Sequence, residues 1–240
     1  MALVKTPKEI EIMKRAAKAT QRALIGALPL IRAGAAEREI ACELEASALK
    51  LEDVDSLAFP VIVASGPNGA QPHAEVTDRI FNIGDFITID FGLIVDGYAS
   101  DITRTFLLGP VSQTQRRIYS SVKRSQYAGL TAAKAGMACA ELDAICRDII
   151  EKDGFGEYFI HTTGHGLGTE VHEDPRIGKD SKTVLEAGMV VTIEPGIYIE
   201  GLGGVRIEDS VIITDAGCEV ITPKIPKNMV SIEKLLSLID

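Results

Sequence analysis

The sequence lacks the features that mark several classes of protein. It has no apolar run close to the ~20 residues that a membrane-spanning helix needs, and its first residues, MALVKTPKEIEIMK, contain no apolar signal core. Its Lys and Arg residues form no cluster, and the formal net charge of -9 and the pI near 5.0 disfavour a nucleic-acid-binding surface. We therefore expect a cytoplasmic protein that binds neither nucleic acid nor membrane.

Cysteine is sparse as well. The four cysteines form no CxxC pair, and in an acidic chain of enzyme size they are better interpreted as reduced core thiols than as a disulfide framework. The chain has 240 residues, of which 46% are hydrophobic, so it is long enough to bury an ordinary core. These properties predict a globular protein.

One stretch that is present, DFITIDFGLIVDGYASDITRTF at 85–106, predicts a hairpin with two carboxylates. Its two runs, rich in Ile, Val, Thr and Phe, flank an Asp-Gly dipeptide at 96–97, which is typical of a tight turn. That turn pairs Asp90 with Thr103 and makes Asp90 and Asp101 diagonal neighbours on one face. Two carboxylates this close repel each other unless a cation lies between them, so the hairpin predicts a metal site.

The chain then repeats its plan. A first half at about 6–110 and a second at about 112–222 each begin with a capping box, continue with two helices and end in a hairpin. We expect the first two helices at 7–29 and 36–51, followed by a strand-like run at 57–63. The last ten residues, SIEKLLSLID, have the pattern of a short helix.

The second hairpin also carries one carboxylate on each strand. Its strands are MVVTIEPGIYI and VRIEDSVII, and if the five residues 200–204 form the loop, Glu208 falls opposite Gly196, two residues past Glu194. Four acidic side chains then converge where the two halves meet. The alternative, that they are simply solvated, is disfavoured because all four lie in Val/Ile/Thr runs that look buried.

A histidine-containing segment, HTTGHGLGTEVHEDP, adds a nitrogen ligand to these carboxylates. It contains His161, His165 and His172, and its glycines exclude a stable helix, so we expect a loop there. One histidine with four carboxylates makes an oxygen-rich site for two divalent cations, bridged by two carboxylates and a hydroxide. Such ligands favour manganese, iron, cobalt or zinc over copper, and we expect manganese first.

These motifs resemble a known family. DFG, DGYASDITRTF, HTTGHGLGTEVHEDP, TIEPGIYI and GGVRIEDSVII are similar to motifs of the dinuclear metallopeptidases: methionine aminopeptidase, aminopeptidase P, prolidase and creatinase. The resemblance implies an α+β pita-bread fold, with pseudo-twofold duplicated helix-helix-hairpin halves around a central antiparallel sheet. It also implies that Glu194 accepts a proton from the attacking water and that Asp101 and Glu208 bridge the metals. The five implied ligands are Asp90, Asp101, His165, Glu194 and Glu208.

Within this family, SGPNGAQPHAEVTDR and GGVRIED resemble the Xaa-Pro branch, which contains Xaa-Pro dipeptidase (prolidase) and aminopeptidase P. The resemblance implies that His73 binds near the scissile bond and that His172 stabilises the carbonyl oxygen in the transition state. It implies that His161 and Arg206 lie on the leaving-group side. An imidazole can donate to a developing oxyanion, and an arginine can anchor a carboxylate of the peptide or orient a neighbouring one.

Simpler interpretations of two of these residues stay open. His161 can be a structural histidine without a role in binding. Arg206 can form an ion pair with Asp209 or Glu208.

The resemblance predicts a metal-dependent exopeptidase that hydrolyses the N-terminal residue from short peptides, preferably at Xaa-Pro bonds. One alternative is a methionine aminopeptidase, although Ala74 and Glu75 follow His73 where that branch has His-Gly-Ile-Pro. Others are a non-catalytic peptide-binding module, which typically loses ligands, and a creatinase-like enzyme. We expect residues 1–240 to form a single catalytic domain without the N-terminal creatinase-type domain, with a homodimer as a candidate assembly.

Overall fold

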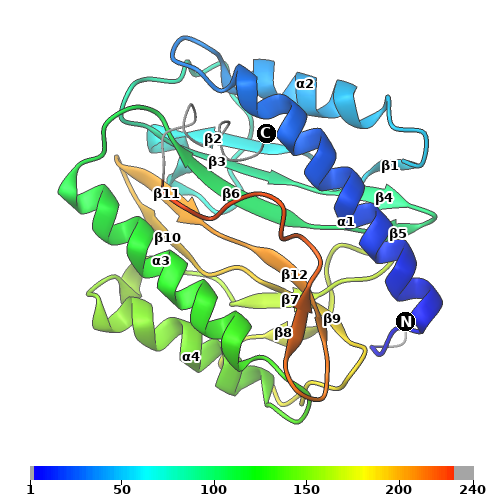
Figure 1. Ribbon diagram of the computed structural model, residues 1–240. Coiled ribbons are helices and arrows are strands. Elements are labelled where there is room, and N and C mark those ends of the chain that lie inside the picture. The colour runs from blue at the N-terminus through cyan, green and yellow to red at the C-terminus, as the bar shows by residue number, and fades with distance from the viewer. Residues whose placement is uncertain (1–2, 230–240) are drawn as a thin grey trace.

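The structure is a computed structural model that describes residues 3–229 (Figure 1). The helix expected at 231–240 lies outside these residues. Within the described residues, four α-helices form two pairs, one for each half of the chain, as Figure 1 shows. These helices are α1 (Pro7–Ala27) with α2 (Glu37–Ala48), and α3 (Gln113–Ala132) with α4 (Cys139–Lys152).

The strands among the described residues pair antiparallel throughout and form four groups. In the first half these are β1 (Ser56–Leu57), β4 (Leu93–Val95) and β5 (Tyr98–Ala99), and then β2 (Ile62–Ser65), β3 (Phe86–Phe91) and β6 (Ile102–Leu107). In the second half, β10 (Gly196–Ile199) pairs with β11 (Gly203–Arg206). The remaining five are β13 (Cys218–Val220), β12 (Asp209–Ile213), β9 (Val190–Ile193), β7 (Gly164–Gly166) and β8 (Glu173–Ile177), in that spatial order. The described residues also include short 3-10 helices: η1 (Leu28–Leu30), η2 (Gly66–Ala70) and η3 (Gly156–Tyr158).

Both halves share the same helix cap and the same glycine turn, as the repeat predicted. Thr6 and Ser112 cap their helices with complete capping boxes. Gly34 and Gly136 have matching positive φ angles of 88° and 85° before the second helix of each half. The structure thus has the duplicated helix-helix-hairpin halves that the expected pita-bread fold requires.

The two halves meet along β6 and the segment that joins β11 to β12. The backbone N–H of Glu208 donates to the carbonyl of Thr103 at 3.1 Å. Two residues on, the hydroxyl of Thr105 donates to the carbonyl of Arg206 at 2.9 Å and accepts from its N–H at 3.1 Å. These bonds bring the carboxylate-bearing strands of the two halves side by side.

The register of the first hairpin is as the Asp-Gly turn predicted, with Asp90 opposite Thr103. The second hairpin differs from its prediction by two residues, because Ile199 pairs with Gly203 and the loop has three residues, not five. Gly201 and Gly203 have φ angles of 77° and 126°, which allow the tighter turn. Gly196 therefore faces Arg206, not Glu208.

The same register continues into the next strand pair, where Ile193 pairs with Asp209. Glu194 and Glu208, which lie between these two strand pairs, are therefore opposite each other in the register. Each of the long strands expected from the sequence is interrupted close to a carboxylate. Asp101, Glu194 and Glu208 all lie at such interruptions, where backbone pairing stops.

Two further expectations were wrong. The run at 57–63 is not one strand, because β1 ends at Leu57 and β2 begins at Ile62. Pro60 lies between them and has no N–H to offer a neighbouring strand. All four cysteines are free, as expected, but Cys42 is exposed, whereas Cys139 and Cys146 are buried.

No helix among residues 3–229 is long and apolar enough to cross a membrane.

A buried ion pair between Arg104 and Asp209 connects the two halves of the chain. Arg104, 1% exposed, donates to the carboxylate of Asp209 at 2.8 Å, and its other N–H groups bond to backbone carbonyls at 103, 208, 222 and 225. Lys227 and Gln126 also bond to Asp209. One side chain thus ties β6 to β12 and to the segment after β13.

We predict that Arg104→Met lowers the free energy of unfolding by about 3–5 kcal/mol, because it leaves a buried carboxylate without its main partner. Urea unfolding followed by circular dichroism measures the change. Arg32→Met is the control, since Arg32 pairs with Glu39 at the surface and its loss should cost less than about 1 kcal/mol. Equal losses in the two variants would contradict this interpretation.

Candidate active site

All four histidines of the chain line one cleft with a volume of about 2010 Å³. The same cleft is lined by Asp90, Asp101, Glu194 and Arg206. Polar groups that converge in a cleft of this size are the usual mark of an active site. Glu208 lies behind this lining and is 1% exposed.

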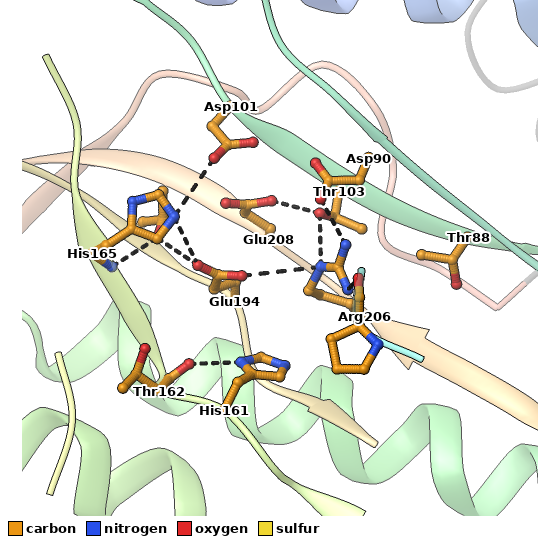
Figure 2. A network of polar contacts seen from close by, with 12 residues as sticks. Thr88, Asp90, Asp101, Thr103, His161, Thr162, His165, Glu194, Arg206 and Glu208 are labelled. Atoms are coloured by element: carbon orange, nitrogen blue, oxygen red, sulfur yellow. Dashed lines mark hydrogen bonds and ion pairs between the residues drawn. The ribbon is translucent and has the colours of Figure 1, made fainter. Parts of the chain in front are cut away.

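Three predicted ligands form a compact group at the floor of the cleft. Asp101, His165 and Glu208 each offer a ligand atom, and these atoms lie within 4.8 Å of one another. Figure 2 shows their side chains turned toward a common space, from both halves of the chain. Carboxylate oxygens and an imidazole nitrogen are suitable ligands for a divalent cation.

His165 reaches this group from a strand, not from the loop that the glycines suggested. It is the middle residue of β7, which lies between β8 and β9. A Cβ at Gly164 would lie 2.0 Å from the carbonyl oxygen of Thr192, and a Cβ at Gly166 would lie 2.1 Å from that of Asp174. The glycines are therefore required because neighbouring strands approach β7 closely.

Glu194 lies beside His165, with 3.1 Å between its Oε1 and the Nε2 of the histidine. The hydroxyl of Thr192 donates to the same Oε1 at 3.0 Å and accepts from the backbone N–H of His165 at 3.1 Å. Thr192 therefore fixes both side chains relative to each other. Among the described residues, the polar contact of Oε2 of Glu194 is one of 4.0 Å with Nε of Arg206.

Asp90 joins the group through an arginine. The guanidinium of Arg206 donates to its Oδ2 at 2.6 Å and to the backbone carbonyl of Pro72 at 3.1 Å. The simpler interpretation of Arg206, an ion pair with Asp209 or Glu208, is wrong, because Asp209 pairs with Arg104 and Lys227 instead.

Three carboxylates of the site keep one oxygen without a partner. Oδ1 of Asp90, Oδ1 of Asp101 and Oε1 of Glu208 are buried and accept no hydrogen bond from the residues that the structure describes. A buried carboxylate oxygen without a donor is costly unless a cation lies next to it. The residues present therefore fit a bound divalent metal.

Burial and mutual repulsion dominate the electrostatics of two carboxylates. The pKa of Asp101 is well above its ordinary value because the group is buried and because Glu208, Asp90 and Glu194 lie nearby. The pKa of Glu208 is well above its ordinary value for the same reasons, burial first and then the charges of Glu194 and Asp90. A cation between these groups would lower both pKa values.

His165 and Glu194 show the opposite behaviour because they stabilise each other's charge. Burial alone lowers the pKa of His165, but the hydrogen bond and charge of Glu194 outweigh it and raise the pKa to about 9. Burial raises the pKa of Glu194, and the same bond to His165 outweighs it and lowers the pKa to about 2. A metal on His165 would replace its proton.

His161 belongs to a chain of directed hydrogen bonds. Its Nδ1 lies 2.8 Å from the carbonyl oxygen of Thr162, so this nitrogen carries the hydrogen. Burial lowers the pKa of His161, so the ring is neutral and its Nε2 accepts from the hydroxyl of Tyr198 at 2.9 Å. That hydroxyl accepts in turn from Arg206 at 2.7 Å. Both ring nitrogens of His161 therefore have partners within the protein.

The two remaining histidines lie on the exposed rim of the cleft. The ring of His172 packs edge-on against that of His165, with 4.4 Å between the centroids. Burial and the charge of His165 lower the pKa of His172, which keeps it neutral near pH 7. His73 lies on the segment that follows η2 and lines the same cleft.

Several residues that hold the site in place were not identified from the sequence. Thr103, Thr192 and Tyr198 bond directly to the predicted ligands or histidines. Asp143 accepts from the N–H and hydroxyl of Thr163 at 3.1 and 2.8 Å and so holds the strand that leads to His165. For Thr103 the predicted register opposite Asp90 was a usable signal, whereas nothing in the sequence pointed to Asp143.

These features define a candidate site for divalent metal ions. The profile of metallopeptidase family M24 matches residues 11–215, and the chain belongs to this family. The family and the ligand group together indicate divalent metal ions.

Several known proteins are similar to this chain in sequence and in structure. An Xaa-Pro dipeptidase of Pyrococcus furiosus is 46% identical over 222 residues, which cover 92% of this chain and 64% of the relative. The solved Xaa-Pro dipeptidase of Bacillus anthracis is 47% identical with a TM-score of 0.93, covering 95% of this chain and 64% of that one. An X-Pro aminopeptidase from Thermotoga maritima is 41% identical with a TM-score of 0.91, over the same shares of both chains. This chain thus spans less than two thirds of the length of these proteins.

We predict that, in the presence of EDTA, the free energy of unfolding falls as the pH rises from 6.5 to 9. The folded pKa of His165 is about 9 against an ordinary 6.5, so its contribution is complete below 6.5 and is lost as the pH rises through 9. Asp101 and Glu208 act in the same direction, because the folded protein keeps their protons to higher pH than the unfolded chain does.

Each excess proton contributes up to about 1.4 kcal/mol per pH unit. Urea midpoints at three pH values measure the slope, and the same series with Mn²⁺ in place of EDTA is the control, where a flatter slope is expected. A stability that rises with pH in EDTA would contradict the assignment.

Proposed function

We propose that the chain carries the catalytic unit of a metal-dependent exopeptidase that removes the N-terminal residue from short peptides, with a preference for Xaa-Pro bonds. The observation that supports this best is the group of buried carboxylates with unpartnered oxygens around His165, at the floor of a cleft lined by all four histidines. The names of the relatives support the substrate class, since they are Xaa-Pro dipeptidases and an X-Pro aminopeptidase.

Two divalent cations, with manganese as the first candidate, are proposed to bind in this group. The proposed ligands are Asp90, Asp101, His165, Glu194 and Glu208, of which Asp101 and Glu208 would be shared. When bound, such ions polarise the scissile carbonyl and lower the pKa of water. The role of the protein's own residues is then to orient the peptide and to transfer protons.

Glu194 is proposed to take the proton from the attacking water. Its Oε1 is held by the hydroxyl of Thr192 and by His165, whereas the partner of Oε2 within residues 3–229 is Arg206, at a distance of 4.0 Å. Oε2 is therefore the atom that can receive a proton.

His172 is proposed to donate a hydrogen bond to the oxygen of the scissile carbonyl. Its lowered pKa leaves a neutral ring with one N–H, and its exposure on the rim leaves that group accessible to a substrate. His73, on the same cleft, is proposed to contact the peptide near the scissile bond.

His161 and Arg206 are proposed to shape the leaving-group side of the cleft. Because both nitrogens of His161 are engaged, its contribution to substrate binding would come from the ring itself and from the position of Tyr198. Arg206 already donates to Asp90, Thr103, Pro72 and Tyr198, which supports the orientation of a carboxylate ligand over direct capture of a substrate carboxylate.

We predict that the protein with Mn²⁺ or Co²⁺ hydrolyses Xaa-Pro dipeptides and tripeptides and that Glu194→Gln lowers kcat by roughly 10²–10⁴-fold. Release of the N-terminal amino acid, quantified by chromatography, measures the rate. Metal content determined on the same samples serves as the control for loss of metal. Turnover of Met-Ala peptides without turnover of Xaa-Pro peptides would contradict the proposed substrate class.

We also predict that His172→Ala lowers kcat by roughly 10²–10³-fold, with a smaller change in KM, because the lost N–H acts mainly on the transition state. Glu170→Gln is the matched control, since Glu170 is an exposed residue of the same segment, and it should leave kcat unchanged. A change in KM alone for His172→Ala would assign the residue to ground-state binding instead.

A further inference from the structure

Thr103 occupies a position between a cation and a carboxylate. Its hydroxyl accepts from Nε of Arg206 at 3.0 Å and lies 2.5 Å from Oε2 of Glu208. The side chain is fully buried, and Figure 2 shows it between these two groups.

The direction of these bonds follows from the donors present. A guanidinium can only donate, so the N–H of Arg206 occupies a lone pair of the Thr103 hydroxyl. The single hydrogen of that hydroxyl then points to Glu208, which is the other polar group in contact with it among the described residues. The short distance is typical of a hydroxyl that donates to a carboxylate.

The bond also determines which oxygen of Glu208 faces the metal group. Oε2 is held by Thr103, and Oε1, buried and without a hydrogen-bond partner, is left toward Asp101 and His165. Thr103 therefore fixes the orientation of the carboxylate.

The hydroxyl has a second consequence, because it keeps Arg206 from pairing with Glu208. The two residues are separated by one position on the same extended segment, so their side chains emerge on one face. The ion pairs of Arg206 among the described residues are nevertheless with Asp90, at 2.6 Å, and Glu194, at 4.0 Å. Without the hydroxyl, Nε of Arg206 would be free to bind Glu208 and to compete with a metal ion for it.

We propose that Thr103 is a positioning residue for the metal group: it relays the hydrogen bond of Arg206 to Oε2 of Glu208, orients that carboxylate and separates it from the guanidinium. This inference rests on the proposed function only for the presence of a metal at Glu208. It concerns how the carboxylate of Glu208 is oriented for metal binding, and not which peptide is cleaved.

The test is a calorimetric titration of the EDTA-treated and dialysed protein with Mn²⁺. Thr103→Val keeps the shape and removes the hydroxyl, and we expect it to weaken Mn²⁺ binding by about 10–100-fold, the usual effect of losing a partner of a metal ligand. Thr103→Ser restores the hydroxyl and should bind Mn²⁺ close to the wild-type value, which a merely space-filling role would not predict.

Thr88→Val is the matched control. Thr88 is a buried threonine on β3 that bonds to the hydroxyl of Thr105 and to the carbonyl of Gly204, and it bonds to no carboxylate of the part of the chain that the structure describes. We expect it to leave Mn²⁺ affinity unchanged. If Thr103→Val does not fold, Thr103→Ala removes the same hydroxyl with less crowding, and it should also lose affinity.

Wild-type Mn²⁺ affinity in the folded Thr103→Val or Thr103→Ala protein would overturn the inference, as would an equal loss in Thr88→Val. A wild-type protein that binds no Mn²⁺ would overturn it as well. The proposed function fails separately, if the wild-type protein binds Mn²⁺ but hydrolyses no Xaa-Pro peptide. In that case the affinities of the Thr103 variants still decide on the role of this residue.

Discussion

Repulsion between buried carboxylates is the constraint on which this structure depends. Asp101 and Glu208 come from different halves of the chain and are both nearly inaccessible to solvent. Oxygens of both lack a hydrogen-bond donor, and the pKa values of both groups are raised. An arrangement of this kind is unfavourable by itself and becomes favourable when a cation is bound, which agrees with the chain's membership of a metallopeptidase family.

The duplicated architecture explains how a chain can hold such groups together. Each half contributes a hairpin whose pairing is interrupted near a carboxylate, and the two interrupted regions are joined by hydrogen bonds between β6 and the β11–β12 segment. The buried pair of Arg104 and Asp209 holds the seam from behind. Backbone at a strand break is released from the sheet ladder, so a side chain there can turn into the cleft while the strands on either side keep it rigid.

The sequence predicted those parts of the site that local chemistry determines. An Asp-Gly turn allows one close register, so the pairing of Asp90 with Thr103 followed from the sequence. The second hairpin has several glycines in its loop, so the chain can turn after three or five residues, and the choice depends on backbone angles that composition does not specify. His165 was expected on a loop because the neighbouring glycines weaken a helix. In the structure, Gly164 and Gly166 are needed because strands that are distant in the sequence pack closely against β7. The hydrogen bonds of Thr103 and Tyr198 depend on side-chain positions in three dimensions, which no local pattern contains.

The most direct test of the account is a crystal structure of the protein soaked with Mn²⁺, with anomalous scattering recorded at a wavelength where manganese contributes strongly. We expect anomalous peaks in contact with Oδ1 of Asp101, Nε2 of His165 and Oε1 of Glu208. Anomalous peaks confined to surface carboxylates, with these three side chains unliganded in a protein soaked at saturating Mn²⁺, would contradict it.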